Sequence, residues 1–168
     1  MNKSLVLTGM MGVGKSTIGR LLAKRLKIKF IDVDKIIEKN ERKTIKQIFD
    51  ENGEKHFRRL EKKITLKLLK NKKAVIALGG GAFINDEIRD KVLKKGVSVW
   101  LKVSLDRLYK RYKRNDKRPL LNRKKLDKEV RNIYLSRKKI YSLANFKINC
   151  DNIDKTKIVE KILDFYEN

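Results

Sequence analysis

One nine-residue segment constrains this chain more than any other. Residues 9–17 read Gly-Met-Met-Gly-Val-Gly-Lys-Ser-Thr, which fits the P-loop pattern of Gly, four free positions and then Gly-Lys-Ser/Thr. The apolar run Leu5-Val6-Leu7 before it is typical of a buried parallel strand. Apolar residues follow it at helical spacing, namely Ile18, Leu21, Leu22 and Leu26. The segment is therefore predicted to join a strand to a helix and to bind nucleotide phosphates.

The residue types in this loop suit the chemistry of a polyphosphate. Three glycines allow backbone N–H groups to curl around the phosphates, and the helix N-terminus adds partial positive charge. Lys15 is expected to reach the transferring phosphate, and the Ser16 hydroxyl to ligate Mg²⁺. The predicted nucleotide contacts of the loop are Gly12, Val13, Gly14, Lys15, Ser16 and Thr17.

Length and composition indicate a single cytoplasmic domain. A chain of 168 residues suits one core, and no stretch approaches the roughly 20 apolar residues of a membrane span. Met1-Asn2-Lys3 leads straight into the first expected strand, so we expect no signal peptide. The single cysteine, Cys150, excludes an internal disulfide and fits a reducing compartment.

The net charge of +25 has two interpretations. Clustered Lys and Arg side chains neutralise phosphates in nucleic-acid-binding proteins, whereas a Lys-rich chain also forms solvated helix faces without any such partner. Here the basic residues are spread through almost every expected helix, and no recognition module stands out. We therefore expect no dedicated nucleic-acid partner, and a positive field that favours anionic substrates such as ATP.

Two carboxylates end the second expected strand, over residues 29–34. Ligands gather at the carboxyl ends of strands in open α/β sheets, so Asp32 and Asp34 should face the P-loop. Being two apart in a strand, their side chains should point to the same side, one serving Mg²⁺ and one the acceptor. The alternative is a pair of turn or N-cap aspartates for the next helix.

Residues 35–70 resemble a helical insertion rather than a plain crossover between strands. Thr44 and Gln47 have capping-box spacing, and Asn52-Gly53 is expected to break the helix that they start. In the longer helix that follows, Arg58 has Glu54 four residues before it and Glu61 three after. A solvated ladder of ion pairs and an arginine oriented to hold an anion are equally compatible with this pattern.

The third expected strand, residues 74–78, ends in Gly79-Gly80-Gly81. Three glycines at the carboxyl end of a strand expose bare backbone to a ligand, although a flexible loop would read the same way. No aspartate ends this strand, so the usual Walker-B carboxylate is missing there. Asp32 is therefore expected to take the magnesium role together with Ser16.

Later segments complete an alternation of strands and helices. Asn85 is expected to cap a helix that Gly96 ends at its C′ position, and residues 97–103 form a fourth strand. A basic, turn-prone segment, residues 110–121, is a candidate lid with Arg118 over the phosphates. A solvated basic loop or a nucleic-acid patch is the alternative for this segment.

The helix after this segment carries an arginine on its apolar stripe. Val130, Tyr134, Arg137 and Tyr141 share one face, and Arg137 either snorkels outward or points into a cavity to pair with an anion. Residues 146–149 form a fifth expected strand, and Ile158, Ile162 and Phe165 mark a closing helix. His56 and Cys150 carry no convincing chemistry, and no His/Cys metal cluster is present in the sequence.

Repeated strand–helix units predict a five-stranded parallel sheet with helices on both faces. With the insertion after the second strand and the basic segment after the fourth, the chain resembles the nucleoside-monophosphate-kinase branch of P-loop proteins and, within it, the shikimate kinase family. The motifs that carry the resemblance are residues 9–17, Asp32-Val33-Asp34, Gly53-Glu54 with Phe57-Arg58 and Glu61, residues 77–81, Arg118-Pro119-Leu120-Leu121, and Arg137 with Tyr141.

The resemblance implies a three-layer α/β/α P-loop kinase fold with a helical substrate-binding insertion and a basic lid. It implies one domain over residues 1–168, with the core at 1–32, 62–110 and 124–168, the insertion at about 33–61 and the lid at about 111–123. It also implies ATP-dependent phosphorylation of the shikimate 3-hydroxyl, on the way to aromatic amino acids, by a Mg²⁺-dependent enzyme expected to be a monomer. A gluconate kinase or, less compatible with the motifs, a basic nucleic-acid-binding NTPase are the alternatives.

The resemblance assigns roles to individual residues. Lys15, Asp34 and Arg118 look catalytic, with Asp34 as the proposed proton acceptor, and Ser16 and Asp32 look like the magnesium pair. Arg111 looks like the adenine-stacking arginine. The residues expected to bind the substrate are Asp34, Phe57, Arg58, Gly79, Gly80, Gly81 and Arg137. One departure is Asn149-Cys150, where the family commonly has an Asp-Thr pair near adenine.

Overall fold

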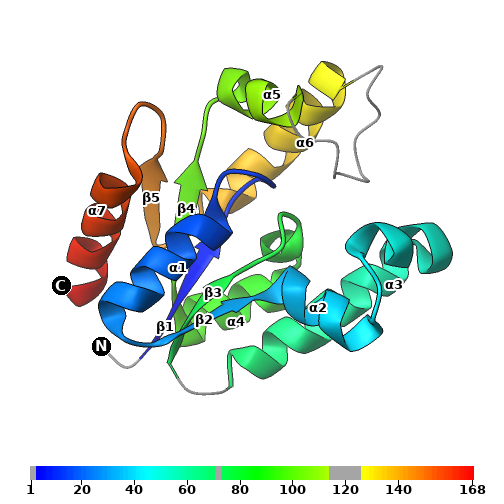
Figure 1. Ribbon diagram of the computed structural model, residues 1–168, viewed down its shortest axis with the longest axis horizontal. Helices are drawn as coiled ribbons and strands as arrows, with labels where there is room; N and C mark the ends of the chain where they lie inside the picture. Colours follow the sequence, from blue (N-terminus) through cyan, green and yellow to red (C-terminus); the bar gives the residue numbers. More distant parts are fainter. Residues whose placement is uncertain (1–2, 71–72, 114–125) are drawn as a thin grey trace.

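The computed structural model describes residues 3–70, 73–113 and 126–168 (Figure 1). Within these ranges the elements, in chain order, are β1 (Ser4–Thr8), α1 (Lys15–Leu26), β2 (Lys29–Asp32), α2 (Val33–Glu41), α3 (Ile45–Leu68), β3 (Ala74–Ala77), the 3₁₀ helix η1 (Ala82–Ile84), α4 (Asp86–Lys95), β4 (Gly96–Lys102), α5 (Leu105–Lys113), α6 (Leu126–Tyr141), β5 (Phe146–Asn149) and α7 (Lys155–Glu167).

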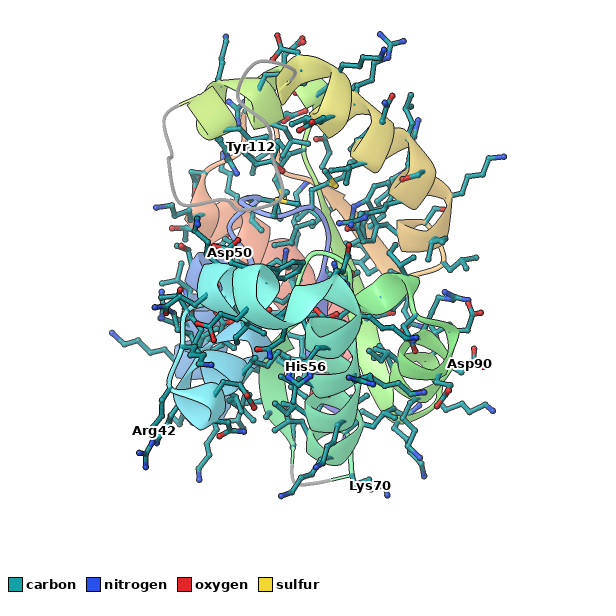
Figure 2. All side chains as sticks on the ribbon, turned by 90° about the vertical axis from the view of Figure 1, so that its right-hand side faces the viewer. Arg42, Asp50, His56, Lys70, Asp90 and Tyr112 are labelled. Carbon is teal, nitrogen blue, oxygen red and sulfur yellow. The ribbon has the colours of Figure 1, made fainter. Side chains whose placement is uncertain are left out.

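The five strands form one parallel sheet in the order β2-β3-β1-β4-β5. Helices α1 and α7 lie on one face of this sheet, and α4 and α6 lie on the other (Figures 1 and 2). The predicted three-layer α/β/α architecture with a five-stranded parallel sheet is therefore confirmed. No helix among the described residues has the length and apolar character needed to cross a membrane.

The central strands are buried on both faces, which explains their apolar sequences. Every residue of β1 and β3 is buried, as are the first six of β4. Strands covered by helices on both sides read as continuous apolar runs rather than alternating ones, and the three runs in this sequence were predictable for that reason. Because all strands are parallel, their carboxyl ends meet at one edge of the sheet.

In the described part of the chain, side-chain caps begin four helices. Thr44 accepts from the Gln47 backbone N–H at 3.2 Å, and the Gln47 side chain returns a bond to the Thr44 backbone, so the predicted capping box is confirmed. Asn85 accepts from the Ile88 N–H at 3.1 Å, which confirms the predicted cap of α4. Asp32 and Asp154 cap α2 and α7 in the same way.

Gly53 interrupts α3. Its φ of 77° and ψ of 168° are not helical, so the predicted break at this point is confirmed as a kink inside α3. The rings of Phe49 and Phe57, whose centroids lie 4.8 Å apart, pack together across the kink. The helix then continues to Leu68, beyond the expected end of the insertion at residue 61, and that division into core and insertion stays a prediction.

Two local predictions are wrong. The second strand ends at Asp32, and Asp34 lies in the first turn of α2, because Asp32 caps that helix instead of continuing the strand. Gly96 does not end α4 in a left-handed conformation: it is extended and begins β4. A Cβ on Gly96 would lie 3.0 Å from Val6 Cγ2 and 3.1 Å from the Ser4 carbonyl, so glycine serves close packing here.

The predicted lid falls mostly outside the described residues. Residues 114–125, which include Arg118 and the Pro119-Leu120-Leu121 motif, are not described. The remaining part of the predicted lid, from Arg111 to Lys113, is the end of α5.

The cap of α4 generates a test of this fold. Replacing Asn85→Ala leaves an N-terminal N–H of α4 without its side-chain acceptor, and we expect the free energy of unfolding to fall by about 1 kcal/mol. Asn85→Asp keeps an acceptor at the same position and should match the wild type. Urea unfolding followed by circular dichroism measures both, and equal losses in the two variants would contradict the assigned cap.

Candidate active site

A cleft of about 800 Å³ opens at the carboxyl edge of the sheet. It lies between the loop after β1, helices α2 and α3, and the glycine segment after β3. Most of the residues predicted from the sequence line it, namely Gly12, Gly14, Lys15, Ser16, Thr17, Asp32, Asp34, Phe57, Arg58, Gly79, Gly80, Gly81 and Arg137. Val13 is buried beneath the loop, Arg111 touches the loop from α5, and Arg118 lies outside the described residues.

The P-loop has the conformation that its glycines predict. Gly9, Gly12 and Gly14 have φ of 132°, 71° and 104°, a region that side chains disfavour. Gly14 occupies the N-cap of α1 and supplies no side-chain acceptor for the first N–H groups of the helix, whose residues Lys15, Ser16 and Thr17 line the cleft. Lys15 Nζ folds back onto the loop, donating to the Gly9 and Met10 carbonyls at 2.8 and 2.9 Å. This arrangement supplies backbone donors and a cation for phosphate oxygens.

Asp32 serves two neighbours at once. Its Oδ2 accepts a 2.6 Å hydrogen bond from Ser16 Oγ, and its Oδ1 accepts from the Lys35 backbone N–H at 3.4 Å. The interpretation of Asp32 as a helix cap is therefore confirmed, and Asp32 also lines the cleft beside Ser16, where its magnesium role stays a prediction. Ser16 and Asp32 present hard oxygen ligands side by side, the kind that Mg²⁺ prefers. Among the described residues, this cleft included, no group of three or more His, Cys, Asp or Glu side chains could hold a metal ion.

Asp34 and Glu61 place two buried carboxylate oxygens against Gly79. Neither Asp34 Oδ1 nor Glu61 Oε1 has a hydrogen-bond partner among the described residues. A Cβ on Gly79 would collide with Glu61 Oε1 and lie 2.8 Å from Asp34 Oδ1, so the missing side chain makes room for both. Buried acceptors of this kind require donors, and a ligand that carries hydroxyl groups would supply them.

The pKa values of these carboxyls are shifted upward. Burial, followed by the charge of Glu61, raises the pKa of Asp34 to about 6, while Lys15 and Arg58 act in the opposite direction. Burial also raises the pKa of Glu61, against the effect of Arg58. Asp34 is therefore poised to exchange a proton within the neutral range, as a group that handles a hydroxyl proton requires.

Arg58 is held in place by both glutamates that the sequence placed within its reach. Nη1 donates to Glu61 Oε2 at 2.7 Å, and Nη2 donates to Glu54 Oε1 at 3.0 Å. The guanidinium also lies 5.1 Å from the centre of the Phe57 ring. A Cβ on Gly81 would lie 2.6 Å from Arg58 Nη1, so the guanidinium presses closely on the glycine segment.

Arg137 turns into the cleft instead of outward to solvent. Its Nη1 donates to the Gly80 carbonyl at 3.0 Å, and its side chain lines the cleft. With Arg58 at Gly81 and Arg137 at Gly80, two guanidinium groups meet the same backbone segment. Two such forks in one place suit the bidentate binding of a carboxylate.

Helix α5 touches the back of the P-loop. Arg111 Nη1 donates to the Gly12 carbonyl at 3.0 Å, and the Tyr112 hydroxyl donates to the Met11 carbonyl at 2.7 Å. Beside this helix, Cys150 is buried and burial raises the pKa of its thiol to about 11, so the thiol is unreactive. Asn149 accepts from the Asp151 N–H at 3.1 Å, a local turn at the position where the sequence departs from the family.

Three features of the cleft go beyond the sequence prediction. Glu61 was expected only to orient Arg58, whereas its second oxygen also faces the cleft. Phe49, in the half of α3 before the kink, lines the cleft together with Phe57. The Tyr141 hydroxyl donates to the Gly80 carbonyl, although Tyr141 was expected only to lie on the apolar stripe of α6 and to follow Arg137 in a motif, with no contact assigned to it. Spacing gave no signal for any of these contacts, because each depends on a distant partner.

Comparison with known proteins gives one consistent result. The family model described as shikimate kinase matches residues 11–167. A shikimate kinase of Persephonella marina is 42% identical over 161 residues, which are 96% of this chain and 97% of that protein. A shikimate kinase of Bartonella henselae is 41% identical over 162 residues, covering 96% of this chain and 77% of that protein.

Solved structures agree with this result. The shikimate kinase from Acinetobacter baumannii in complex with shikimate has a TM-score of 0.93 at 31% identity, covering 99% of this chain and 93% of that chain. A gluconokinase from Sinorhizobium meliloti 1021 has a TM-score of 0.62 at 16% identity, covering 97% of this chain and 90% of that chain. The second likeness is one of fold alone.

The raised pKa of Asp34 predicts a pH-dependent cost in stability. Because the folded pKa of about 6 exceeds the ordinary value of 3.8, folding favours the protonated form, and this contribution is lost as pH rises through 6. Asp34→Asn should therefore be more stable than the wild type by about 1–3 kcal/mol at pH 8, with little difference at pH 4. Urea unfolding at both pH values measures it, with Asp90→Asn on α4 as an exposed control. A difference independent of pH would contradict the assignment.

Proposed function

The chain belongs to the shikimate kinase family, and we propose that it transfers the γ-phosphoryl group of ATP to the 3-hydroxyl of shikimate, giving shikimate 3-phosphate and ADP. This is a step in the biosynthesis of chorismate and the aromatic amino acids. The single observation that best supports the proposal is the content of the cleft. A phosphate loop, a buried carboxylate that lacks a donor among the described residues, and two guanidinium groups face one another across it.

The P-loop side of the cleft suits the nucleotide. Backbone N–H groups of residues 12–17 would bind the phosphates of ATP, and Lys15 Nζ would exchange its two loop carbonyls for phosphate oxygens. Ser16 and Asp32 would hold Mg²⁺, which when bound screens the charge of the phosphates. Arg111, already at the Gly12 carbonyl, is proposed to stack on adenine, and Arg118 to reach the phosphates.

The opposite side suits a hydroxylated carboxylic acid. Arg58 and Arg137 would grip the carboxylate, since both guanidinium groups lie at the glycine segment. Gly79, Gly80 and Gly81 would bring bare backbone against the ring of the substrate. Asp34 would accept from its hydroxyls, and Phe57 would form an apolar wall.

Transfer then requires little covalent chemistry from the protein. The 3-oxygen forms a bond to the γ-phosphorus as the bond from that phosphorus to the leaving oxygen of ADP breaks. Asp34 orients the hydroxyl and takes its proton, while Lys15 and Arg118 stabilise the charge on the transferring group. The Asp34 carboxylate suits this role because its raised pKa, about 6, makes it a better proton acceptor than an ordinary aspartate while leaving it mostly ionised near neutral pH.

We also propose that the protein is a cytoplasmic monomer without a dedicated nucleic-acid partner. The cysteine is a buried free thiol, which suits a reducing compartment. The large hydrophobic side chains that are exposed in the described residues are Leu21 on α1, Leu135 on α6 and Leu143, and they form no extended apolar patch for a partner subunit to cover. The family match supports a shikimate kinase and favours neither alternative, a gluconate kinase or a nucleic-acid-binding NTPase.

A coupled assay of ADP release tests the proposed reaction. We expect turnover with shikimate to exceed that with gluconate or nucleoside monophosphates by at least about 100-fold, because nucleoside monophosphates lack the carboxylate that Arg58 and Arg137 would bind and because the family acts on shikimate rather than gluconate. Asp34→Asn should lower kcat by at least about 100-fold and leave the Kd of ATP within about twofold, since the change removes the proton acceptor and leaves the P-loop intact. Comparable turnover of gluconate, or full activity of Asp34→Asn, would refute the assignment.

Arg137 generates a separate prediction. Arg137→Ala removes one of two carboxylate-binding forks, and we expect KM for shikimate to rise by about 10- to 100-fold with little change in KM for ATP. Arg131→Ala on the exposed side of the same helix controls for loss of a positive charge. An equal rise in KM for the two substitutions would show that Arg137 contributes only its positive charge and does not bind the carboxylate directly.

A further inference from the structure

Tyr141 and Arg137 donate hydrogen bonds to one shared acceptor at the cleft. The Tyr141 hydroxyl donates to the Gly80 carbonyl, and Arg137 Nη1 donates to the same oxygen at 3.0 Å. The two residues are four apart on α6, so their side chains lie on the same face of the helix. A carbonyl oxygen has two lone pairs and can accept from both donors.

Substrate binding would change this arrangement if Arg137 binds the carboxylate through its Nη1 group. A bidentate pair that uses both Nη groups would take that donor away from the Gly80 carbonyl. A partly buried acceptor left without any donor costs free energy, and the glycine segment that shapes the cleft would be free to move. The second donor, Tyr141, prevents that loss.

We propose that Tyr141 is a positioning residue that keeps the Gly80 carbonyl bonded when Arg137 leaves it for the carboxylate of the substrate. Tyr141 does not touch the substrate in this account. Its hydroxyl holds residues 79–81 in place and lowers the free-energy cost of moving Arg137 away from the Gly80 carbonyl. The affinity for the substrate therefore depends on this hydroxyl. The inference rests on the proposed function, because the anion that draws Arg137 away is the shikimate carboxylate.

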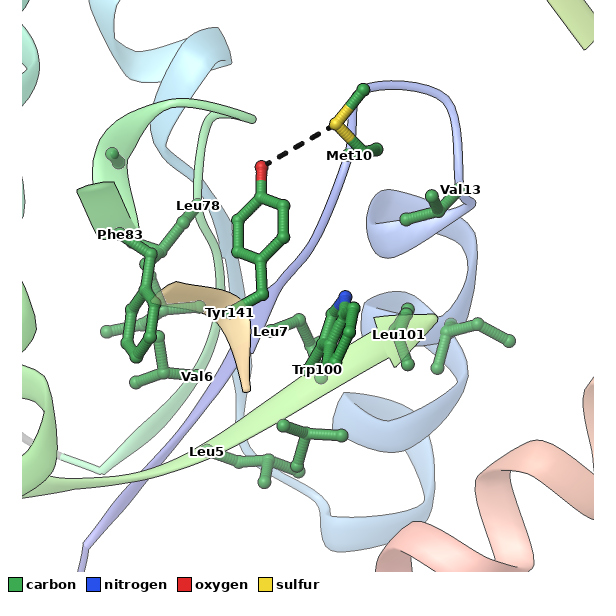
Figure 3. Close-up of a cluster of buried hydrophobic side chains, with 14 of the residues drawn as sticks. Leu5, Val6, Leu7, Met10, Val13, Leu78, Phe83, Trp100, Leu101 and Tyr141 are labelled. Carbon is green, nitrogen blue, oxygen red and sulfur yellow. Dashed lines mark hydrogen bonds between the residues drawn. The ribbon is translucent and has the colours of Figure 1, made fainter. Parts of the chain in front are cut away.

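The surroundings of Tyr141 fix its ring independently of that hydroxyl. The side chain is fully buried, its ring centroid lies 5.9 Å from that of Trp100, and the Met10 sulfur lies 4.0 Å from the hydroxyl oxygen (Figure 3). Burial raises the pKa of the phenol to about 12, against the charge of Arg137 and a hydrogen bond with it. The hydroxyl therefore stays protonated and remains a donor at every pH at which the enzyme would work.

Kinetics of Tyr141→Phe test the proposal, because this change removes the hydroxyl and keeps the ring. We expect KM for shikimate to rise about fivefold to tenfold, with KM for ATP within about twofold and kcat within about threefold of the wild type. Tyr166→Phe is the matched control: Tyr166 is also buried, and its hydroxyl also donates to a backbone carbonyl, that of Lys3, away from the cleft. Both variants should lose some thermal stability, and only Tyr141→Phe should change KM for shikimate.

The outcomes separate this inference from the function on which it rests. A wild type that does not phosphorylate shikimate would refute the proposed function itself. If the wild type phosphorylates shikimate but neither Tyr141→Phe nor Tyr166→Phe changes KM for shikimate, the role of Tyr141 alone is overturned. A parallel rise in KM for ATP and shikimate would indicate general damage to the fold and would also overturn it.

A double-mutant cycle checks the coupling to Arg137. In an Arg137→Ala background the guanidinium is absent from the Gly80 carbonyl before and after binding, so adding Tyr141→Phe should change kcat/KM for shikimate by less than about twofold. Additive effects of the two substitutions would overturn the inference.

A crystal structure of the wild type with shikimate gives a test that needs no variant. The Tyr141 hydroxyl should still meet the Gly80 carbonyl while Arg137 has left it, and retention of the Arg137 contact there would contradict the proposal.

Discussion

The parallel register of β1, β2 and β3 is the constraint on which the rest of the structure depends. Ala77 of β3 pairs with Leu7 of β1 on one side and with Asp32 of β2 on the other, so the three strands end at one level. The P-loop, the cap of α2 and the glycine segment therefore leave the sheet side by side. The 2.6 Å hydrogen bond from Ser16 to Asp32 joins the segments that follow β1 and β2, and it depends on this common level.

Burial of like charges is the main cost of this cleft. Helices α2 and α3 bring Asp34 and Glu61 together. Both side chains fit because Gly79 has no side chain in the space that they occupy. Burial is the largest cause of the raised pKa of each carboxyl, the charge of Glu61 adds to it at Asp34, and the surrounding cations offset these effects only in part. The buried carboxylate oxygens lower the stability of the folded protein, and the same oxygens are available to bind the hydroxyl groups of a ligand. Such a loss of stability in favour of activity is common at functional sites.

Sequence alone predicted what local patterns encode. The P-loop, the buried strands, the Thr44 capping box and the kink at Gly53 each follow from a few neighbouring residues. Asp34 was misplaced because one aspartate can end a strand and begin a helix, and Asp32 does both. The direction of Arg137 stayed open because its acceptor, Gly80, lies 57 residues away. Gly96 was misread for a similar reason, since its packing partners belong to the first strand.

The double service of Asp32 has a consequence for how such a chain can diverge. A substitution there would alter the cap of the helix that carries Asp34 and would also remove the partner of Ser16, so no single compensating change elsewhere could restore both. Few substitutions are therefore expected to be tolerated at the nucleotide end of the cleft. More substitutions should be tolerated at Phe49 and Phe57, two apolar residues on either side of a kink, because their replacement would change the shape of the acceptor side alone. New acceptor preferences in a lineage of this kind should begin in α3, with the donor chemistry inherited intact.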